Sequence, residues 1–111
     1  MKNIQLTCAH ALIKYLIAQK TLIDGKKVPL FPGVFGIFGH GNVACLGQAL
    51  QENQKDLPTW RGHHEQNMAL TGIAYSRAKR RRQIFIATSS VGPGSTNMIT
   101  AAAVAMSNRI P

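Results

Sequence analysis

Residues 84–88 read IFIAT and lead into the loop SSVGPG at 89–94 and a long apolar segment at 96–108. A short apolar run bounded by a glycine-rich loop is typical of a strand buried in a parallel sheet. The segment after the loop predicts a helix. A second run, VFGIF at 34–38, is followed by GHGN at 39–42 and by a predicted helix at 43–52. The chain therefore repeats the order strand, glycine-containing loop and helix.

The rest of the chain fits between these two units. Thr7 is placed to cap a helix that ends near Gln19, and a polar turn centred on Asp-Gly covers residues 23–29. A brief strand is predicted at 59–61 and a helix from Glu65 to about Lys79. Strands alternating with helices predict an α/β fold, a parallel sheet with helices on both faces. Three strands for four helices leave that sheet incomplete at the C-terminus, so we expect part of a domain.

The composition allows partners that the arrangement of charges disfavours. The 111 residues, 45% of them hydrophobic, suffice for one domain, and the net charge of +9 permits contact with nucleic acid or membranes. The densest cluster, at 77–82, lies at a predicted helix C-terminus, where cations oppose the helix dipole, and no aromatic residues interleave with it. We therefore expect no nucleic-acid and no membrane partner. Two cysteines and no apparent signal peptide predict a cytoplasmic protein.

Several motifs admit more than one interpretation. GHGNVA at 39–44 fits a dinucleotide-binding pattern, but no acidic residue ends the next strand, and the loop at 92–94 lacks the lysine of a phosphate-binding loop. A small basic nucleotide- or nucleic-acid-binding module is the alternative from another functional class. His63, His64 and Glu65 are metal-ligand types, but Met68 stands where a zinc motif needs its second histidine, so we expect no metal site. Glu65 itself has a purely structural explanation, because an acid at a helix N-terminus is stabilised by the dipole.

Two longer motifs decide between these interpretations. RGHHEQNMALTGIAYSRA at 61–78 and IATSSVGPGSTN at 86–97 resemble the pyrimidine-binding domain of thiamine-diphosphate-dependent enzymes of the acetohydroxyacid synthase-like group. GIFGHG at 36–41 lies where that group has its first strand and active-site loop. The resemblance implies the thiamine-diphosphate-binding fold. It makes residues 1–111 the N-terminal part of that domain, without the central and diphosphate-binding domains.

Three departures narrow the resemblance. The longer loop at 90–91, the insert at 24–29 and the form of 37–43 are similar to hydrolases of myo-inositol catabolism that open trihydroxycyclohexane-1,2-dione, a cyclic 1,2-diketone. Another lyase or transferase of the same group is the alternative.

The resemblance also implies roles for individual residues. Glu65 is the expected catalytic acid, bonded to the pyrimidine ring of the cofactor, and a dry site is expected to raise its pKa. The remaining expected residues line the pocket on the cofactor's pyrimidine side (Gly92, Pro93, Gly94, Asn97) or face the substrate (Gly39, His40, Gly41, Asn42). For His40, fixing the loop backbone is an equally good explanation.

The resemblance finally implies what this chain needs from elsewhere. Mg²⁺ and the diphosphate are expected to bind a motif that residues 1–111 lack. The active sites are expected to lie between subunits of a homodimer or homotetramer, so this chain would supply half a site and be inactive alone. The predicted helix at 96–108, apolar on nearly every side, is expected to be covered by another surface.

Overall fold

A three-stranded parallel sheet forms the centre of the computed structural model, which describes residues 3–111. The strands are β3 (Val34–Gly36), β4 (Thr59–Arg61) and β5 (Ile86–Thr88), in the order β4–β3–β5. Phe35 of the central strand is opposite Trp60 on one side and Ala87 on the other. The predicted parallel sheet is confirmed. Strands β3 and β5 are shorter than the predicted runs at 34–38 and 84–88.

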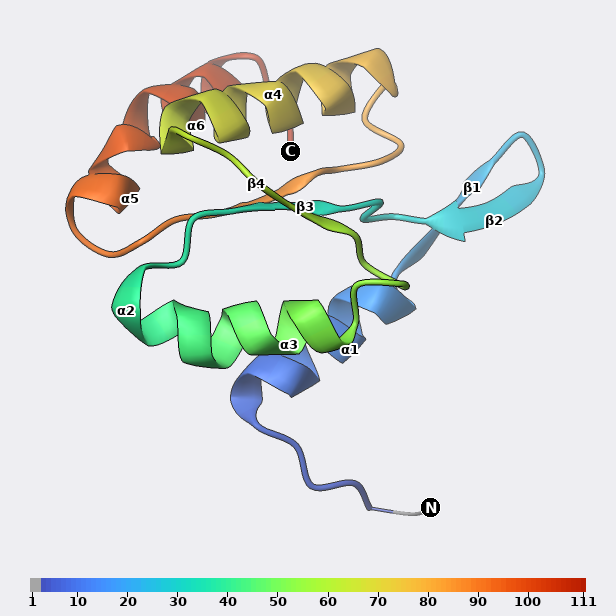
Figure 1. Ribbon diagram of the computed structural model, residues 1–111. Helices are drawn as coiled ribbons and strands as arrows, with labels where there is room; N and C mark the ends of the chain where they lie inside the picture. The colour runs from blue at the N-terminus through green and yellow to red at the C-terminus, as the bar shows by residue number, and fades with distance from the viewer. Residues whose placement is uncertain (1–2) are drawn as a thin grey trace.

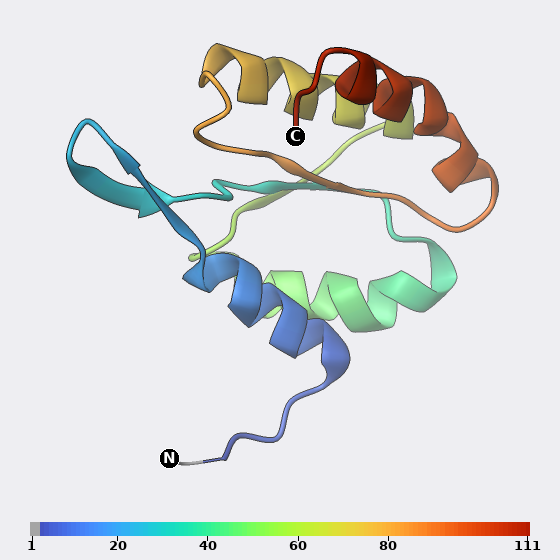
Figure 2. The same ribbon diagram turned by 180° about the vertical axis from the view of Figure 1, so that it is seen from behind.

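Helices cover both faces of this sheet, as predicted (Figure 1). On one face lie α4 (Glu65–Ala78), α5 (Pro93–Asn97) and α6 (Ile99–Ser107). On the other lie α1 (Cys8–Ala18) and one continuous helical segment with three parts: α2 (Gly39–Asn42), a π-helical turn (Val43–Gly47) and α3 (Gln48–Glu52). The view from behind shows the same three layers (Figure 2).

The core fills the space between the sheet and the layer of α1 and α3. Its fully buried side chains are Ile13, Val34, Ala49, Leu50 and Leu57. The opposite face of the sheet is covered by an aromatic row in which Phe35 and Phe85 stack with ring centroids 4.7 Å apart. Trp60 and Tyr75 contact Phe85 from either side. The strands therefore carry apolar side chains on both faces, although Trp60 at the edge of the sheet is 48% exposed.

A β-hairpin replaces the simple polar turn that the sequence predicted. Strands β1 (Lys20–Ile23) and β2 (Lys26–Pro29) pair antiparallel and project from the body of the molecule (Figures 1 and 2). Asp24 and Gly25 form the connection with φ angles of 50° and 77°. A two-residue Asp-Gly turn with positive φ matches the twist of antiparallel strands, which explains why pairing extends along both polar arms.

Two predicted helix boundaries were wrong. Helical structure already begins at Gly39, because the amide of Val43 bonds to the Gly39 carbonyl and turns the loop into α2. The predicted helix at 96–108 is two helices divided at Met98, whose amide bonds three residues back to Ser95. The first of the two begins at Pro93, where a missing amide hydrogen costs nothing. No helix within residues 3–111 has the length and apolarity needed to cross a membrane.

Candidate functional site

The three parallel strands end at the same edge of the sheet, and a helix begins beyond each of them (Figure 1). Strand β3 leads to Gly39 and α2, β4 leads to Glu65 and α4, and β5 leads to Pro93 and α5. Ligand sites of open α/β sheets form where the carboxyl ends of parallel strands meet. The fold thus brings the three sequence motifs to one end of the molecule.

Glu65 is the buried acid of this end. It is the first residue of α4, and only 7% of its surface is exposed. The side-chain amide of Asn97 donates to Glu65 Oε2 over 3.3 Å. A Cβ atom at position 94 would lie 2.5 Å from Glu65 Oε1 and would also meet Ser90 Oγ, so only glycine lets α5 approach this closely. Gly94 and Asn97 therefore hold the carboxylate from the side of α5.

The pKa of Glu65 is lowered, which corrects the expectation that a dry site raises it. The main cause is the hydrogen bond from its own backbone N–H at the start of α4, followed by the donor Asn97. Burial acts in the opposite direction but is outweighed. Unpaired amide hydrogens at a helix N-terminus favour a negative charge. Within this chain, Glu65 is therefore a carboxylate at neutral pH.

The loops that follow β3 and β5 touch each other. Gly39 has a φ of +68°, and a Cβ atom there would lie 2.9 Å from Ser90 Cβ. Gly92, with a φ of +65°, precedes α5 and accepts hydrogen bonds from the amide and hydroxyl of Thr96. Of the residues predicted to lie near the pyrimidine, Gly94 and Asn97 contact Glu65, whereas Gly92 and Pro93 build the start of α5.

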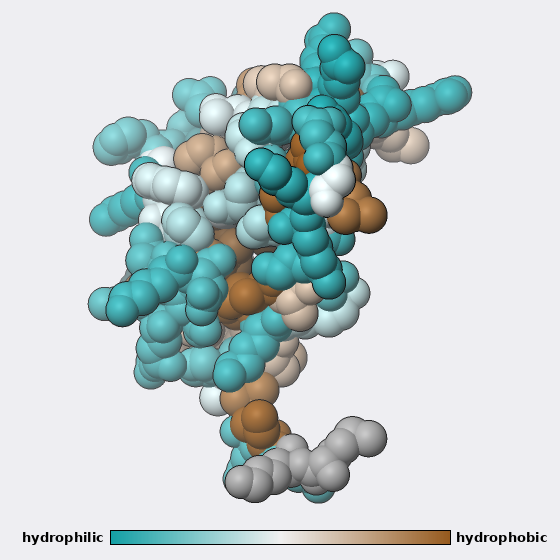
Figure 3. Space-filling view, turned by 90° about the vertical axis from the view of Figure 1, so that its right-hand side faces the viewer, coloured by the Kyte–Doolittle hydropathy of each residue, from teal (hydrophilic) through white to brown (hydrophobic). Residues whose placement is uncertain are grey.

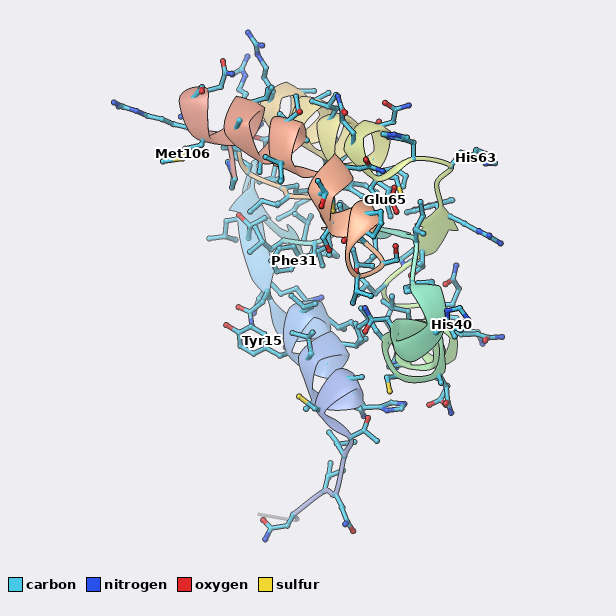
Figure 4. All side chains as sticks on the ribbon, turned by 90° about the vertical axis from the view of Figure 1, so that its left-hand side faces the viewer. Tyr15, Phe31, His40, His63, Glu65 and Met106 are labelled. Carbon is cyan, nitrogen blue, oxygen red and sulfur yellow. The ribbon has the colours of Figure 1, made fainter. Side chains whose placement is uncertain are left out.

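His40 and Glu65 border two adjacent hollows rather than a single one. The His40 hollow has a volume of about 530 Å³ and is otherwise lined mainly by apolar residues or glycine. The Glu65 hollow, of about 610 Å³, also includes His63. Ile37 and Arg61 line both hollows. Figure 4 shows His40, His63 and Glu65 on the same side of the molecule.

The four residues predicted to face the substrate are therefore not equivalent. Gly39 and His40 line the His40 hollow, whereas Gly41 and Asn42 line neither hollow. Ile37, Arg61 and Ser90 were missed by the sequence analysis. Arg61 ends the strand at 59–61, and its place at the carboxyl edge of the sheet was the available signal.

Comparison with known proteins identifies the domain. The family described as thiamine pyrophosphate enzyme, N-terminal TPP binding domain, matches residues 32–111. The chain belongs to this thiamine pyrophosphate enzyme family. The match begins just before β3, so it includes the whole parallel sheet and leaves α1 and the β1–β2 hairpin in front of it.

Individual members of the family match the chain over all 111 residues. It is 50% identical to the 3D-(3,5/4)-trihydroxycyclohexane-1,2-dione hydrolase of Clostridium tetani (strain Massachusetts / E88). It is 51% identical to the enzyme of that name from Geobacillus thermodenitrificans (strain NG80-2) and 50% to that of Bacillus thuringiensis (strain Al Hakam). The chain spans 17% of the length of each of these relatives. Helix α1 and the hairpin thus lie within the region of similarity to these hydrolases.

Proposed function

We propose that this chain is the pyrimidine-binding part of a thiamine-diphosphate-dependent hydrolase that opens the ring of trihydroxycyclohexane-1,2-dione. The observation that carries the proposal is the similarity of all 111 residues to relatives with that activity in their name. The buried carboxylate of Glu65, held by α5 at the carboxyl edge of the sheet, supports it.

The residues around Glu65 fit the aminopyrimidine ring of the cofactor. A flat nitrogen heterocycle needs an apolar wall and a hydrogen-bond partner for its ring nitrogen. Ile37 supplies the wall of the Glu65 hollow, and Glu65 supplies the carboxylate. Gly94 keeps the space beside Oε1 clear of a side chain. These residues fit only the pyrimidine end of the cofactor.

Glu65 would act by holding a proton at the pyrimidine ring nitrogen. When bound, thiamine diphosphate supplies a carbon nucleophile at C2 of its thiazolium ring and accepts the electron pair of the broken carbon–carbon bond. The pKa of Glu65 is lowered within this chain. Further burial would have to raise this pKa before the carboxyl group could share a proton with the ring. We assign that burial to the cofactor and to the second subunit that would complete the site. Asn97 would help to hold the carboxylate in place through Oε2.

The remaining parts of the site belong to the longer protein in this proposal. Mg²⁺ and the diphosphate would bind in a separate domain, and the assembly would be a homodimer or homotetramer. His40 would face the substrate from the His40 hollow.

The test is an assay of the full-length protein that contains this chain. We expect it to consume trihydroxycyclohexane-1,2-dione only when thiamine diphosphate and Mg²⁺ are supplied, with one carboxylic acid group formed per turnover. The isolated 111-residue chain, as the matched control, is expected to show no turnover and negligible cofactor binding. Condensation of pyruvate in place of dione hydrolysis would assign the protein to the synthases and overturn the proposal.

A further inference from the structure

Arg61 lies at the boundary between the two hollows. It is the last residue of β4, where it pairs with Gly36 of the central strand. It lines the His40 hollow together with Phe38 and Val43, and it lines the Glu65 hollow together with His63. One arginine is thus shared by the linings of both hollows.

The backbone of Arg61 is held on both sides. Its strand is paired with β3, and the next residue, Gly62, lies so close to the side chain of Met68 that a Cβ atom would collide with it. The tight link between β4 and α4 therefore sets the position of Arg61 relative to Glu65. Sites built on strands and helices hold their side chains more precisely than sites on loops.

The charge of Arg61 has no acidic partner within the part of the chain that the structure describes. The ion pairs between residues 3 and 111 are His10–Glu52 and Arg82–Asp24, and neither involves Arg61. Its neighbours in the His40 hollow are mainly apolar. Arg61 is itself exposed, so its charge is free to bind an anion that enters either hollow.

We propose that Arg61 binds the carboxylate that the hydrolysis creates, an inference that rests on the proposed function. Water cleaves a 1,2-diketone between its two carbonyl carbons. One carbon takes the hydroxyl group of water and becomes a carboxylic acid, and the other takes the hydrogen and becomes an aldehyde. The acid loses a proton at neutral pH, so the substrate is neutral and the product is an anion.

Arg61 is suited to this product for two physical reasons. The planar guanidinium donates two parallel hydrogen bonds to a carboxylate, which a neutral diketone cannot accept in the same way. The carboxylate of Glu65 also lines the Glu65 hollow, and it repels a second negative charge. Arg61 offsets that repulsion, whereas His40 and His63 each line only one of the two hollows.

The test measures binding of a sugar acid and needs no cofactor. The full-length protein that contains this chain, without added cofactor, is titrated by calorimetry with glucuronate and, separately, with the neutral sugar glucose. We expect glucuronate to bind and glucose to show no binding. Arg61→Gln and Arg61→Met should each weaken glucuronate binding about tenfold or more, and Arg61→Lys should weaken it less. Arg77→Gln, an exposed arginine on α4, is the matched control with unchanged binding.

Equal binding of glucuronate and glucose overturns the proposal, as does wild-type affinity in both neutral variants. Two neutral variants are used so that misfolding of one leaves the other to decide. A full-length protein without dione hydrolase activity whose Arg61 still binds glucuronate would refute the proposed function and leave the anion site standing. A full-length protein that hydrolyses the dione but binds glucuronate equally well after Arg61 is replaced would support the proposed function and refute the anion site.

Discussion

The side-chain amide of Asn97 donates a hydrogen bond to Glu65 Oε2 over 3.3 Å and so joins α5 to the first turn of α4. The two residues come from the two sequence motifs that resemble the thiamine-diphosphate enzymes. Their contact makes the ionisation of Glu65 depend on the position of α5. The contact between the two motifs can therefore be measured through the pKa of Glu65.

Replacing Asn97 by alanine should raise the pKa of Glu65. The amide stabilises the charged form, so its removal moves the pKa from its lowered value toward the ordinary 4.5. A ¹³C NMR titration of the Glu65 carboxyl in the 111-residue chain measures this shift. Asn67→Ala, on the exposed side of α4, is the control and should leave the titration unchanged. An unchanged titration in Asn97→Ala would show that the Asn97 amide does not affect the ionisation of Glu65.

The same substitution should alter how stability depends on pH. A lowered pKa in the folded state stabilises the protein above the ordinary value, and this contribution is lost as the pH falls through the lowered one. Asn97→Ala should therefore be less stable than wild type near neutral pH, and the difference should vanish in acid, where Glu65 is protonated in both. Urea unfolding across the acid range measures it. A difference that is constant with pH would indicate a purely structural effect.

In the full-length protein, the proposed function predicts that Glu65→Gln folds and keeps the cofactor but slows exchange of the cofactor's C2 proton. Glutamine preserves the shape and the hydrogen bonds but cannot exchange a proton with the pyrimidine ring. Loss of such acid–base assistance typically costs about 10²–10⁴-fold. Deuterium exchange at C2 is the measurement, and Glu52→Gln on α3 is the control. Exchange as fast as in the wild type would exclude Glu65 from the mechanism.

Gly94→Ala should displace the Glu65 carboxylate with little effect on the fold. The added Cβ meets Glu65 Oε1 and Ser90 Oγ, which are ends of side chains and can move aside. A shift of about 1 Å at a reacting group can cost about 10²-fold in rate. We expect a full-length variant with near wild-type unfolding temperature and strongly reduced turnover. Gly41→Ala, with no atom within 4 Å of the new Cβ, tests whether any added methyl group has this effect.

The sequence predicted the parallel sheet and the position of Glu65 because both depend on local patterns. The bounds of α4 agree with the prediction to one residue, since a charged segment precedes a regular run of small and apolar residues. The hairpin was missed because its strands are too polar to show apolar alternation. The loop at 39–42 was misjudged because glycine, which disfavours helices, is needed there for its positive φ at Gly39.

The electrostatics of the site could not be derived from sequence patterns. The pKa of Glu65 depends on Asn97, 32 residues away, and on the geometry of its own amide. Arg61 enters the site because β4 lies beside β3, and that strand order follows from packing rather than from a motif. Both features arise only once the three layers assemble.

The last prediction concerns the outer surface of α6, which should drive self-association of the 111-residue chain. Within α6, Ala101 is buried, but Ile99, Val104 and Met106 are 63%, 37% and 84% exposed. Figure 4 shows Met106 at the far end of α6, away from the sheet. Figure 3 shows that polar side chains prevail on another side of the molecule. An exposed apolar helix face beside the edge strand β5 is a surface that a second copy can cover.

Static light scattering over a concentration series measures this association. Added salt should strengthen it, because salt screens the repulsion between chains of charge +9. The double variant Ile99→Glu, Met106→Glu should remain monomeric at concentrations where the wild type associates. Val91→Glu removes an equally exposed apolar side chain from the loop before α5, and it should associate like the wild type. A wild-type chain that stays a cooperatively folded monomer at high concentration and high salt would show that α6 needs no cover, and would also remove the argument that this surface faces a second subunit.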